Sequence, residues 1–319
     1  MFKGLIKLVV ALAFLVIIIG GYLWWGPGPL AKSATVTIRE GSTMGSAARD
    51  LAAAGAIRGR GWYYAGRVMG GGAPIQAGEF EIPAHASGAA VLDLLQHGRP
   101  VQRLITVSEG MPAIIVAEKL AALAYLTGPV PDIREGSVLP DSYGFERGEP
   151  RAKVVGRMQA AMTKVLASLW AARKGDCPVS TPQQAITLAS IVEKETGKAS
   201  ERPTIAGVYC NRLKIGMKLD ADPTVIYPVT KGKPLGRRIL RSELNAITGY
   251  NTYRERGLPA GPITNPGRES IAAVLSPAPT MALYFVADGT GGHVFAETLA
   301  QHQANVSKWF KLRRERGEM

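Results

Sequence analysis

The sequence is poor in the residues that many enzyme sites depend on. Its 319 residues include only four histidines and two cysteines, too few for a zinc-type ligand cluster or a disulfide framework. It lacks GxSxG, HExxH and Walker motifs, and no GxGxxG follows a strand pattern, which argues against serine–histidine, metalloprotease and nucleotide sites. We therefore expect no metal and no cofactor, and carboxylate chemistry remains. The spacing leaves Cys177 and Cys210 open as buried, free or paired.

Acidic residues are scarce relative to basic ones. The chain has 25 Asp and Glu against 38 Lys and Arg, a formal net charge of +13. Such a balance favours an anionic partner, which could be nucleic acid, a phospholipid surface or an acidic wall polymer. Charge alone does not choose among them.

The first residues predict a single membrane anchor. No charged residue occurs from Leu8 to Trp25, and a helix over residues 5–25 would be about 31 Å long, enough for one bilayer core. Lysines precede the run and aromatic residues end it, which indicates that the N-terminus is inside. We expect residues 1–4 in the cytoplasm, residues 5–25 as a transmembrane helix, and everything after Gly26 on the other side of the membrane.

The alternative for this segment is a cleaved signal peptide, with Ala31-Lys32-Ser33 as a passable cleavage site. Signal peptides have apolar regions of about 7 to 15 residues, shorter than this run, so the anchor is favoured. Residues 26–34 begin with Gly-Pro-Gly-Pro and form a stiff linker. An exported domain leaves the lipid bilayer and wall polymers as partners and argues against nucleic acid.

Beyond the linker the patterns predict an α+β protein with two domains. ATVTIREGST alternates as a strand does, and MGSAARDLAAAGAI has helical spacing. The same strand-turn-helix word returns as LITVSEGMPAIIVAEKLAAL, with Glu40-Gly41 matched by Glu109-Gly110. We expect a small module over residues 35–100 and a larger domain over 101–319. In the larger domain, SVLPDSYGFERG and NTYRERGLPAGPITNPG are predicted loops, and ALYFVADGTGGHVF is predicted to be two strands joined by a glycine turn.

One helix carries the best candidate for acid catalysis. Pro182 opens it after a Ser/Thr cap, and Gly197 is its expected stop. On a helical wheel Glu195 falls between Leu188 and Ile191 on the apolar arc, whereas Glu193 lies at the edge of that arc. An apolar setting raises a carboxyl pKa toward the working pH, as a general acid requires. The competing interpretation is a solvated helix end.

Polar residues downstream form a second candidate group. They combine amide, carboxyl and hydroxyl groups suited to sugar hydroxyls and acetamido groups, although the same residue types build ordinary turns. His293, after two glycines, fits a satisfied strand-end histidine better than a catalytic one. The candidates for substrate binding are Asn211, Asp222, Thr224, Tyr227, Asn251 and Tyr253.

The words LPDSY, ASIVEKETG, VYCNRLKIGMKLDADPTVIY, YNTYRERGLPAGPITNPG and YFVADGTGGHVFAETLAQH together resemble the endolytic murein transglycosylase family, also called YceG-like or MltG. The resemblance covers most of residues 35 to 310. It implies a LysM-like α+β module followed by an α+β catalytic domain, with Glu195 as the essential glutamate and Glu193 as the fallback. The chain departs from the family at Asp220, where glutamine is common.

The resemblance further implies the chemistry. An enzyme of this kind cuts the MurNAc–GlcNAc bond of nascent glycan strands and leaves 1,6-anhydroMurNAc ends, which would terminate strand elongation. Peptidoglycan strands are then the substrate, and peptidoglycan synthases are candidate partners. Two alternatives stay open: a non-catalytic, membrane-anchored scaffold that binds peptidoglycan, and an ordinary hydrolase in which Asp222 activates water beside Glu195.

Overall fold

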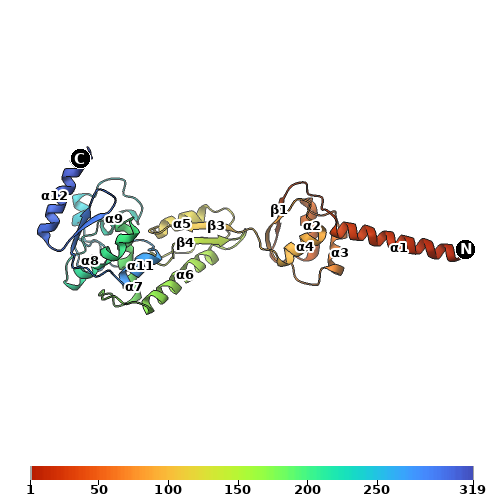
Figure 1. Ribbon diagram of the computed structural model, residues 1–319, viewed down its shortest axis with the longest axis horizontal. Helices are drawn as coiled ribbons and strands as arrows, with labels where there is room; N and C mark the ends of the chain where they lie inside the picture. Colours follow the sequence, from red (N-terminus) through yellow and green to blue (C-terminus); the bar gives the residue numbers. More distant parts are fainter. Residues whose placement is uncertain (1, 319) are drawn as a thin grey trace. The chain divides into compact units, whose positions relative to one another are not determined.

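The computed structural model describes residues 2–318, with side chains from residue 6 onward. The expected cytoplasmic segment 1–4 begins at Met1, which lies outside the described residues. The chain divides into unit 1, residues 1–103 and 144–148, and unit 2, residues 104–143 and 149–319. Both contain helices and strands (Figure 1), so the predicted α+β class is confirmed. The sequence patterns do not foresee the return of residues 144–148 to unit 1.

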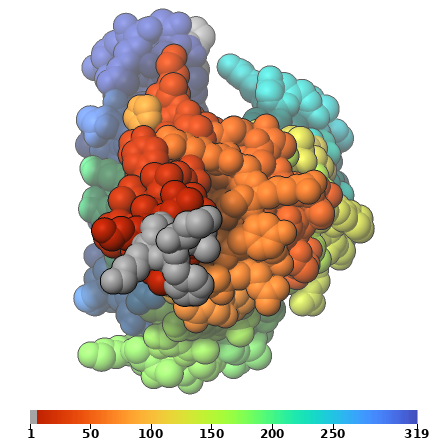
Figure 2. All heavy atoms as spheres, turned by 90° about the vertical axis from the view of Figure 1, so that its right-hand side faces the viewer, coloured from red at the N-terminus to blue at the C-terminus, as the bar shows by residue number. Residues whose placement is uncertain are grey.

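The N-terminal helix α1 (Phe2–Trp25) contains an apolar stretch, Ile6–Trp25, that is long enough to cross a membrane. Its last turn is part of unit 1, because Trp24 is only 4% exposed and packs in the core of that unit. In Figure 2, seen from the N-terminal end of α1, the orange segment around α3 lies beside the red helix. A helix whose last turn completes a folded core fits a retained anchor better than a removed leader.

Unit 1 is a two-stranded antiparallel sheet covered by three helices. Strands β1 and β2 pair with Val36 opposite Phe80, and both of these side chains face the core. Thr43 caps the first of the helices by accepting a hydrogen bond from the Ser46 amide, as expected for a Thr at this position. Whether the module is LysM-like stays a prediction. Its elements are β1 (Ala34–Ile38), α2 (Met44–Ala53), α3 (Gly61–Met69), β2 (Gly78–Ile82) and α4 (Gly88–His97). The sequence patterns missed α3.

The predicted echo between the two domains is confirmed as local structure. β3 (Arg103–Val107) and α5 (Ala113–Ala122) repeat the strand-turn-helix order of β1 and α2. Gly41 and Gly110 have φ of 75° and 72°, a left-handed conformation that glycine adopts at little cost. Contrary to the predicted loop, SVLPDSYGFERG contains a strand, β4 (Asp141–Phe145), which pairs with β3. Pairing with a distant strand, which no local pattern reveals, accounts for the difference.

Helices build the core of unit 2 around α7 (Pro182–Glu195). Six of its apolar side chains have no exposed surface, and helices α8 and α11 pack against it. Thr181 caps its first turn and Pro182 occupies its start, as predicted. The other helices of unit 2 between α5 and the C-terminal strands are α6 (Arg151–Ala171), α8 (Arg202–Lys214), α9 (Asp222–Thr230), α10 (Arg241–Asn245) and α11 (Arg268–Leu275), with the 3-10 turn Ala199–Glu201 before α8.

The C-terminal part of unit 2 follows the prediction. β5 (Tyr284–Ala287) and β6 (His293–Ala296) form an antiparallel pair across the glycine turn, and the basic helix α12 (Leu299–Glu315) ends the chain. Cys177 and Cys210 form a disulfide, which settles the question the sequence left open. The bond ties the segment before α7 to the middle of α8, and it is typical of an oxidising compartment.

Candidate functional site

Glu195 is the last residue of α7, at the point where the helix leaves the core. Its neighbours on the preceding turn, Ile191 and Val192, are fully buried, while the glutamate itself is partly exposed. The next residue, Thr196, is already in an extended conformation. The helix therefore places the Glu195 carboxyl at the edge of the packed core, where it is accessible.

A buried tyrosine holds this carboxyl. The Tyr209 hydroxyl on α8 donates a hydrogen bond of 2.8 Å to Glu195 Oε1, and its ring packs edge-to-face on Phe285 of β5. Burial raises the pKa of Glu195 to about 7, although the Tyr209 hydrogen bond acts in the opposite direction. Burial also raises the pKa of Tyr209 well above its usual value, so the hydroxyl keeps its proton and remains the donor. A carboxyl whose pKa lies near the working pH can both give and take a proton.

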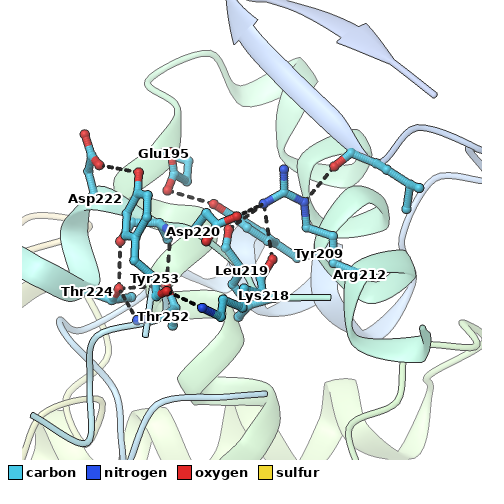
Figure 3. A network of polar contacts seen from close by, with 12 residues as sticks. Glu195, Tyr209, Arg212, Lys218, Leu219, Asp220, Asp222, Thr224, Thr252 and Tyr253 are labelled. Carbon is cyan, nitrogen blue, oxygen red and sulfur yellow. Dashed lines mark hydrogen bonds and ion pairs between the residues drawn. The ribbon is translucent and has the colours of Figure 1, made fainter. Parts of the chain in front are cut away.

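A second carboxyl lies nearby at the start of α9 (Figure 3). Asp222 is exposed, and its Oδ1 accepts a hydrogen bond of 2.7 Å from the Tyr253 hydroxyl. The charge of Asp222 raises the pKa of Glu195 further. Burial, reinforced by the bond to Asp222, raises the pKa of Tyr253. Asp222 and Tyr253, both predicted substrate residues, thus lie together beside Glu195.

Arg212 holds backbone segments next to these residues. Its guanidinium is buried and donates to the Leu283 carbonyl at 2.6 Å and to the Leu219 carbonyl at 2.7 Å. Asp220 lies 3.9 Å from it and has a positive φ of 47°. Burial raises the pKa of Asp220, and the positive charge of Arg212 opposes this effect. The departure noted at Asp220 therefore adds a carboxyl to the edge of the site.

His293 begins β6 and pairs with Glu201. Its Nδ1 lies 2.7 Å from Glu201 Oε2, and its backbone amide donates to Glu201 Oε1. Although burial opposes ionisation of Glu201, the hydrogen bonds from His293 lower its pKa. The histidine ring also packs edge-to-face on Phe285, the residue that supports Tyr209. His293 is a strand-end histidine with its hydrogen bonds satisfied, as predicted. Through Phe285 it also supports the ring of Tyr209.

Three predicted binding residues point into the protein. Thr224 and Asn251 are at most 1% exposed; the Thr224 hydroxyl donates to the Ala221 carbonyl. The Asn251 amide donates to three backbone carbonyls in the last turn of α10 and just after it. The Asn211 amide likewise donates to two carbonyls that precede β5. The side chains of Thr224 and Asn251 hold the segments next to Asp222 and Tyr253, whereas Asn211 holds the segment that leads into β5.

Glu193, the fallback acid, has a different environment. Only 4% of its side chain is exposed, and it accepts hydrogen bonds from Arg202 at 3.3 Å and from the Gly267 amide at 2.8 Å. Arg202 also pairs with Glu109. These contacts describe a structural ion pair.

Sequence patterns did not single out Tyr209, Arg212 or Glu201. Tyr209 lies in the apolar stretch VYC of α8, a pattern typical of ordinary core residues. Its hydrogen-bond partner Glu195 is on another helix, so no local pattern connects the two. Tyr227, the remaining predicted residue, lines a separate cavity of the same unit beside Tyr250. Among residues 2–318 no cluster of His, Cys, Asp and Glu has the makings of a metal site.

Comparisons with known proteins identify the family of the chain. The model of the YceG-like family matches residues 36–308. An endolytic murein transglycosylase of Bacillus subtilis is 34% identical over 182 residues, which cover 57% of this chain and 49% of the relative. An endolytic murein transglycosylase of Streptococcus pneumoniae is 34% identical over 180 residues, covering 54% of this chain and 32% of the relative. The chain thus spans half or less of the length of these relatives.

A solved structure supports the fold. The crystal structure of a YceG-like protein from Listeria monocytogenes aligns with a TM-score of 0.52 and 22% sequence identity. The alignment covers 86% of this chain and 98% of that one. At this identity the likeness concerns the fold alone.

Proposed function

Because the chain belongs to the YceG-like family, we propose that it cleaves peptidoglycan glycan strands with Glu195 as the general acid. The single observation that carries this proposal is the carboxyl of Glu195, partly exposed at a helix end, with its pKa raised by burial to about 7. The relatives named as endolytic murein transglycosylases supply the substrate class.

The proposed reaction is lytic. Protonated Glu195 gives its proton to the oxygen that joins MurNAc to GlcNAc, and the bond to the MurNAc C1 breaks. The resulting carboxylate takes the proton of the MurNAc C6 hydroxyl, whose oxygen then bonds to C1. The products are a 1,6-anhydroMurNAc end and a free GlcNAc hydroxyl, and Glu195 is protonated again. One carboxyl suffices because no water molecule has to be activated, unlike in ordinary glycosidases.

The other predicted residues support this step in two ways. Asp222 and Tyr253 border Glu195 and are proposed to bind sugar hydroxyl or acetamido groups. Asp222 also raises the pKa of Glu195 through its charge, which favours the acid form. Thr224 and Asn251 are proposed to contribute indirectly, since their hydrogen bonds hold the segments next to the contacting residues. Asn211 is proposed to contribute by holding the segment that leads into β5, whose Phe285 packs on Tyr209.

The location proposed for the enzyme is the outer face of the bacterial inner membrane. The apolar stretch Ile6–Trp25 supports a single-pass anchor, and lysines before it with tryptophans at its end favour an N-terminus inside. The disulfide between Cys177 and Cys210 fits an exported domain. At this location the enzyme would meet nascent strands, terminate their elongation and have peptidoglycan synthases as partners.

Product analysis tests the proposal. The full chain, in detergent micelles, is incubated with uncrosslinked glycan strands, and the products are identified by mass spectrometry. We expect anhydroMurNAc ends from the wild-type chain and from Glu193→Gln after correction for its folded fraction, and none from Glu195→Gln. Formation of anhydroMurNAc ends by Glu195→Gln at the wild-type rate would reject the acid assignment.

Two other results would redirect the assignment. Reducing ends in place of anhydroMurNAc ends would indicate a hydrolase, for which the carboxylate of Asp222 next to the site is the candidate base. Strands that stay intact but bind to the chain would indicate the scaffold role.

A further inference from the structure

Unit 2 contains a large cavity separate from the contacts around Glu195. Its volume is about 990 Å³, and it is bounded by the start of α5, residues 130–137, the first half of α7, the end of α9 and residues 260–262. Tyr227 and Tyr250 form one wall, with ring centroids 4.9 Å apart. The volume is in the range of small-molecule sites.

The cavity and the Glu195 group share their supporting elements. Thr187 lines the cavity and precedes Glu195 on α7 by about 12 Å of helix rise. Helix α9 carries Asp222 at its start and Tyr227 farther along, and one loop carries both Tyr250 and Tyr253. A polymeric substrate bound at Glu195 would therefore have other parts of itself within reach of the cavity.

The cavity is lined by charges of both signs. Asp132, Arg134, Glu135 and Lys231 all border it. Within residues 2–318, none of the four takes part in an ion pair. Neutral sugars would leave these charges without partners. A ligand that carries both a carboxylate and an amine would complement them.

Lys231 occupies a position where a lysine is costly. It ends α9 in the left-handed conformation, with φ of 56°, which glycine or asparagine adopts more readily. Gly232, the next residue, is also left-handed. Strained backbone positions often have a functional role. A ligand for the exposed ammonium group of Lys231, at the edge of the cavity, would explain why a lysine occupies this position.

Glu135 is a half-buried acidic residue of the same lining. Both of its oxygens lie 3.0 Å from the Ala113 amide at the start of α5, which fixes the direction of the carboxyl group. Burial raises the pKa of Glu135 to about 7 and that of Tyr227 to about 12. The Tyr227 hydroxyl keeps its proton, so this side of the cavity offers hydrogen-bond donors as well as acceptors.

We infer that this cavity binds the peptide stem of the peptidoglycan strand, with Lys231 pairing with a stem carboxylate and Glu135 receiving a stem amine. The inference rests on the proposed function, because the stem reaches the cavity as part of the strand that Glu195 cleaves. It deepens that function by assigning recognition of the peptide to a place remote from the bond that breaks.

Binding of the isolated stem tests the inference independently of strand cleavage. Isothermal titration calorimetry is carried out with the full chain in detergent micelles and a synthetic stem pentapeptide that has a diamino acid at its third position. We expect the wild-type chain and Glu195→Gln to bind it alike, and Lys231→Asn to bind about 10-fold or more weakly. Asparagine suits the left-handed backbone, so the melting temperature of Lys231→Asn should match or exceed that of the wild type.

The matched control is Lys153→Asn, which removes an exposed lysine of α6 outside the cavity lining and should bind like the wild type. No binding by the wild-type chain, or equal binding by Lys231→Asn, would overturn the inference. Since the assay detects the peptide alone, loss of strand cleavage would refute the proposed function without changing this result.

A second measurement separates peptide from sugar as the ligand. The ratio of kcat/KM on peptide-bearing strands to kcat/KM on peptide-free strands is expected to exceed one for the wild type and to fall about 10-fold in Lys231→Asn. The Lys153→Asn control should keep the wild-type ratio. An equal loss on both kinds of strand would assign the cavity to the glycan and overturn the peptide assignment.

Discussion

Tyr209→Phe changes a single property of the site. The ring is buried and packs on Phe285, and phenylalanine preserves that packing. What is lost is the hydroxyl that donates the 2.8 Å hydrogen bond to Glu195. Because the bond stabilises the charged carboxylate, its loss should raise the pKa of Glu195 above its present value of about 7.

The size of the change follows from the energy of the bond. A hydrogen bond to a charged group contributes about 1.5 to 3 kcal/mol, and 1.36 kcal/mol corresponds to one pH unit. We therefore expect the pKa of Glu195 to increase by about 1 to 2 pH units, to about 8 or 9. Since the free enzyme must hold the proton, activity falls as pH rises through this pKa, and the variant should stay active at higher pH than the wild type.

The assay is kcat/KM for anhydroMurNAc formation, measured between about pH 5 and pH 10. Tyr143→Phe is the matched control, because Tyr143 donates its hydroxyl to the Leu139 carbonyl elsewhere in unit 2. We expect its alkaline limb at the wild-type position. An alkaline limb in Tyr209→Phe that is unchanged or moves to lower pH would refute the reasoning.

Three further predictions concern stability. Folding raises the pKa of Glu195 from 4.5 to about 7, so the stability that the protonated carboxyl gives the wild type is fully present below about pH 4.5 and is lost as pH rises through 7. The free energy of unfolding of Glu195→Gln, measured with urea, should therefore exceed that of the wild type by about 3 kcal/mol at pH 8 and by less at pH 5. Replacing Cys177 and Cys210 by serine opens a link with a sequence separation of 33 and should cost about 4 kcal/mol in the same assay. Glu193→Gln should lower the melting temperature by weakening the buried pair with Arg202, while the residual activity keeps its alkaline limb in place.

Local patterns predicted much of the fold. Cap and proline signals located the start of α7 at Thr181-Pro182, and the glycine turn between β5 and β6 was identified because each strand pairs with its neighbour in sequence. Helix α7 ends at Glu195, two residues before the expected stop at Gly197. Thr196 is extended, and its hydroxyl donates to Glu201 and accepts from the Lys198 amide, contacts with residues farther along the chain that the helix pattern does not reveal.

Features of the site could be predicted from the sequence only where the pattern of a single helix indicates them. The helical wheel placed Glu195 against apolar side chains, and its raised pKa agrees with that placement. The same wheel put Glu193 at the edge of the buried arc, yet its side chain is only 4% exposed, because other helices cover the second face of α7. Tyr209 and Arg212 act through residues on other elements, and a single sequence does not reveal such pairings.

The burial of Trp24 in the core of unit 1 has a mechanical consequence. A helix joined to a domain by a flexible tether can tilt in a bilayer without moving the domain, but α1 contacts α3 and α4 and completes the core with its last turn. Membrane helices respond to hydrophobic mismatch by tilting, on average by about 20°. Because Trp24 is packed in the core of unit 1, a tilt of α1 would turn unit 1 together with the helix. If α1 spans the bilayer as proposed, bilayer thickness is therefore expected to affect the orientation of unit 1. Polarised fluorescence of a label on unit 1, measured in oriented supported bilayers of different acyl-chain length, should change accordingly.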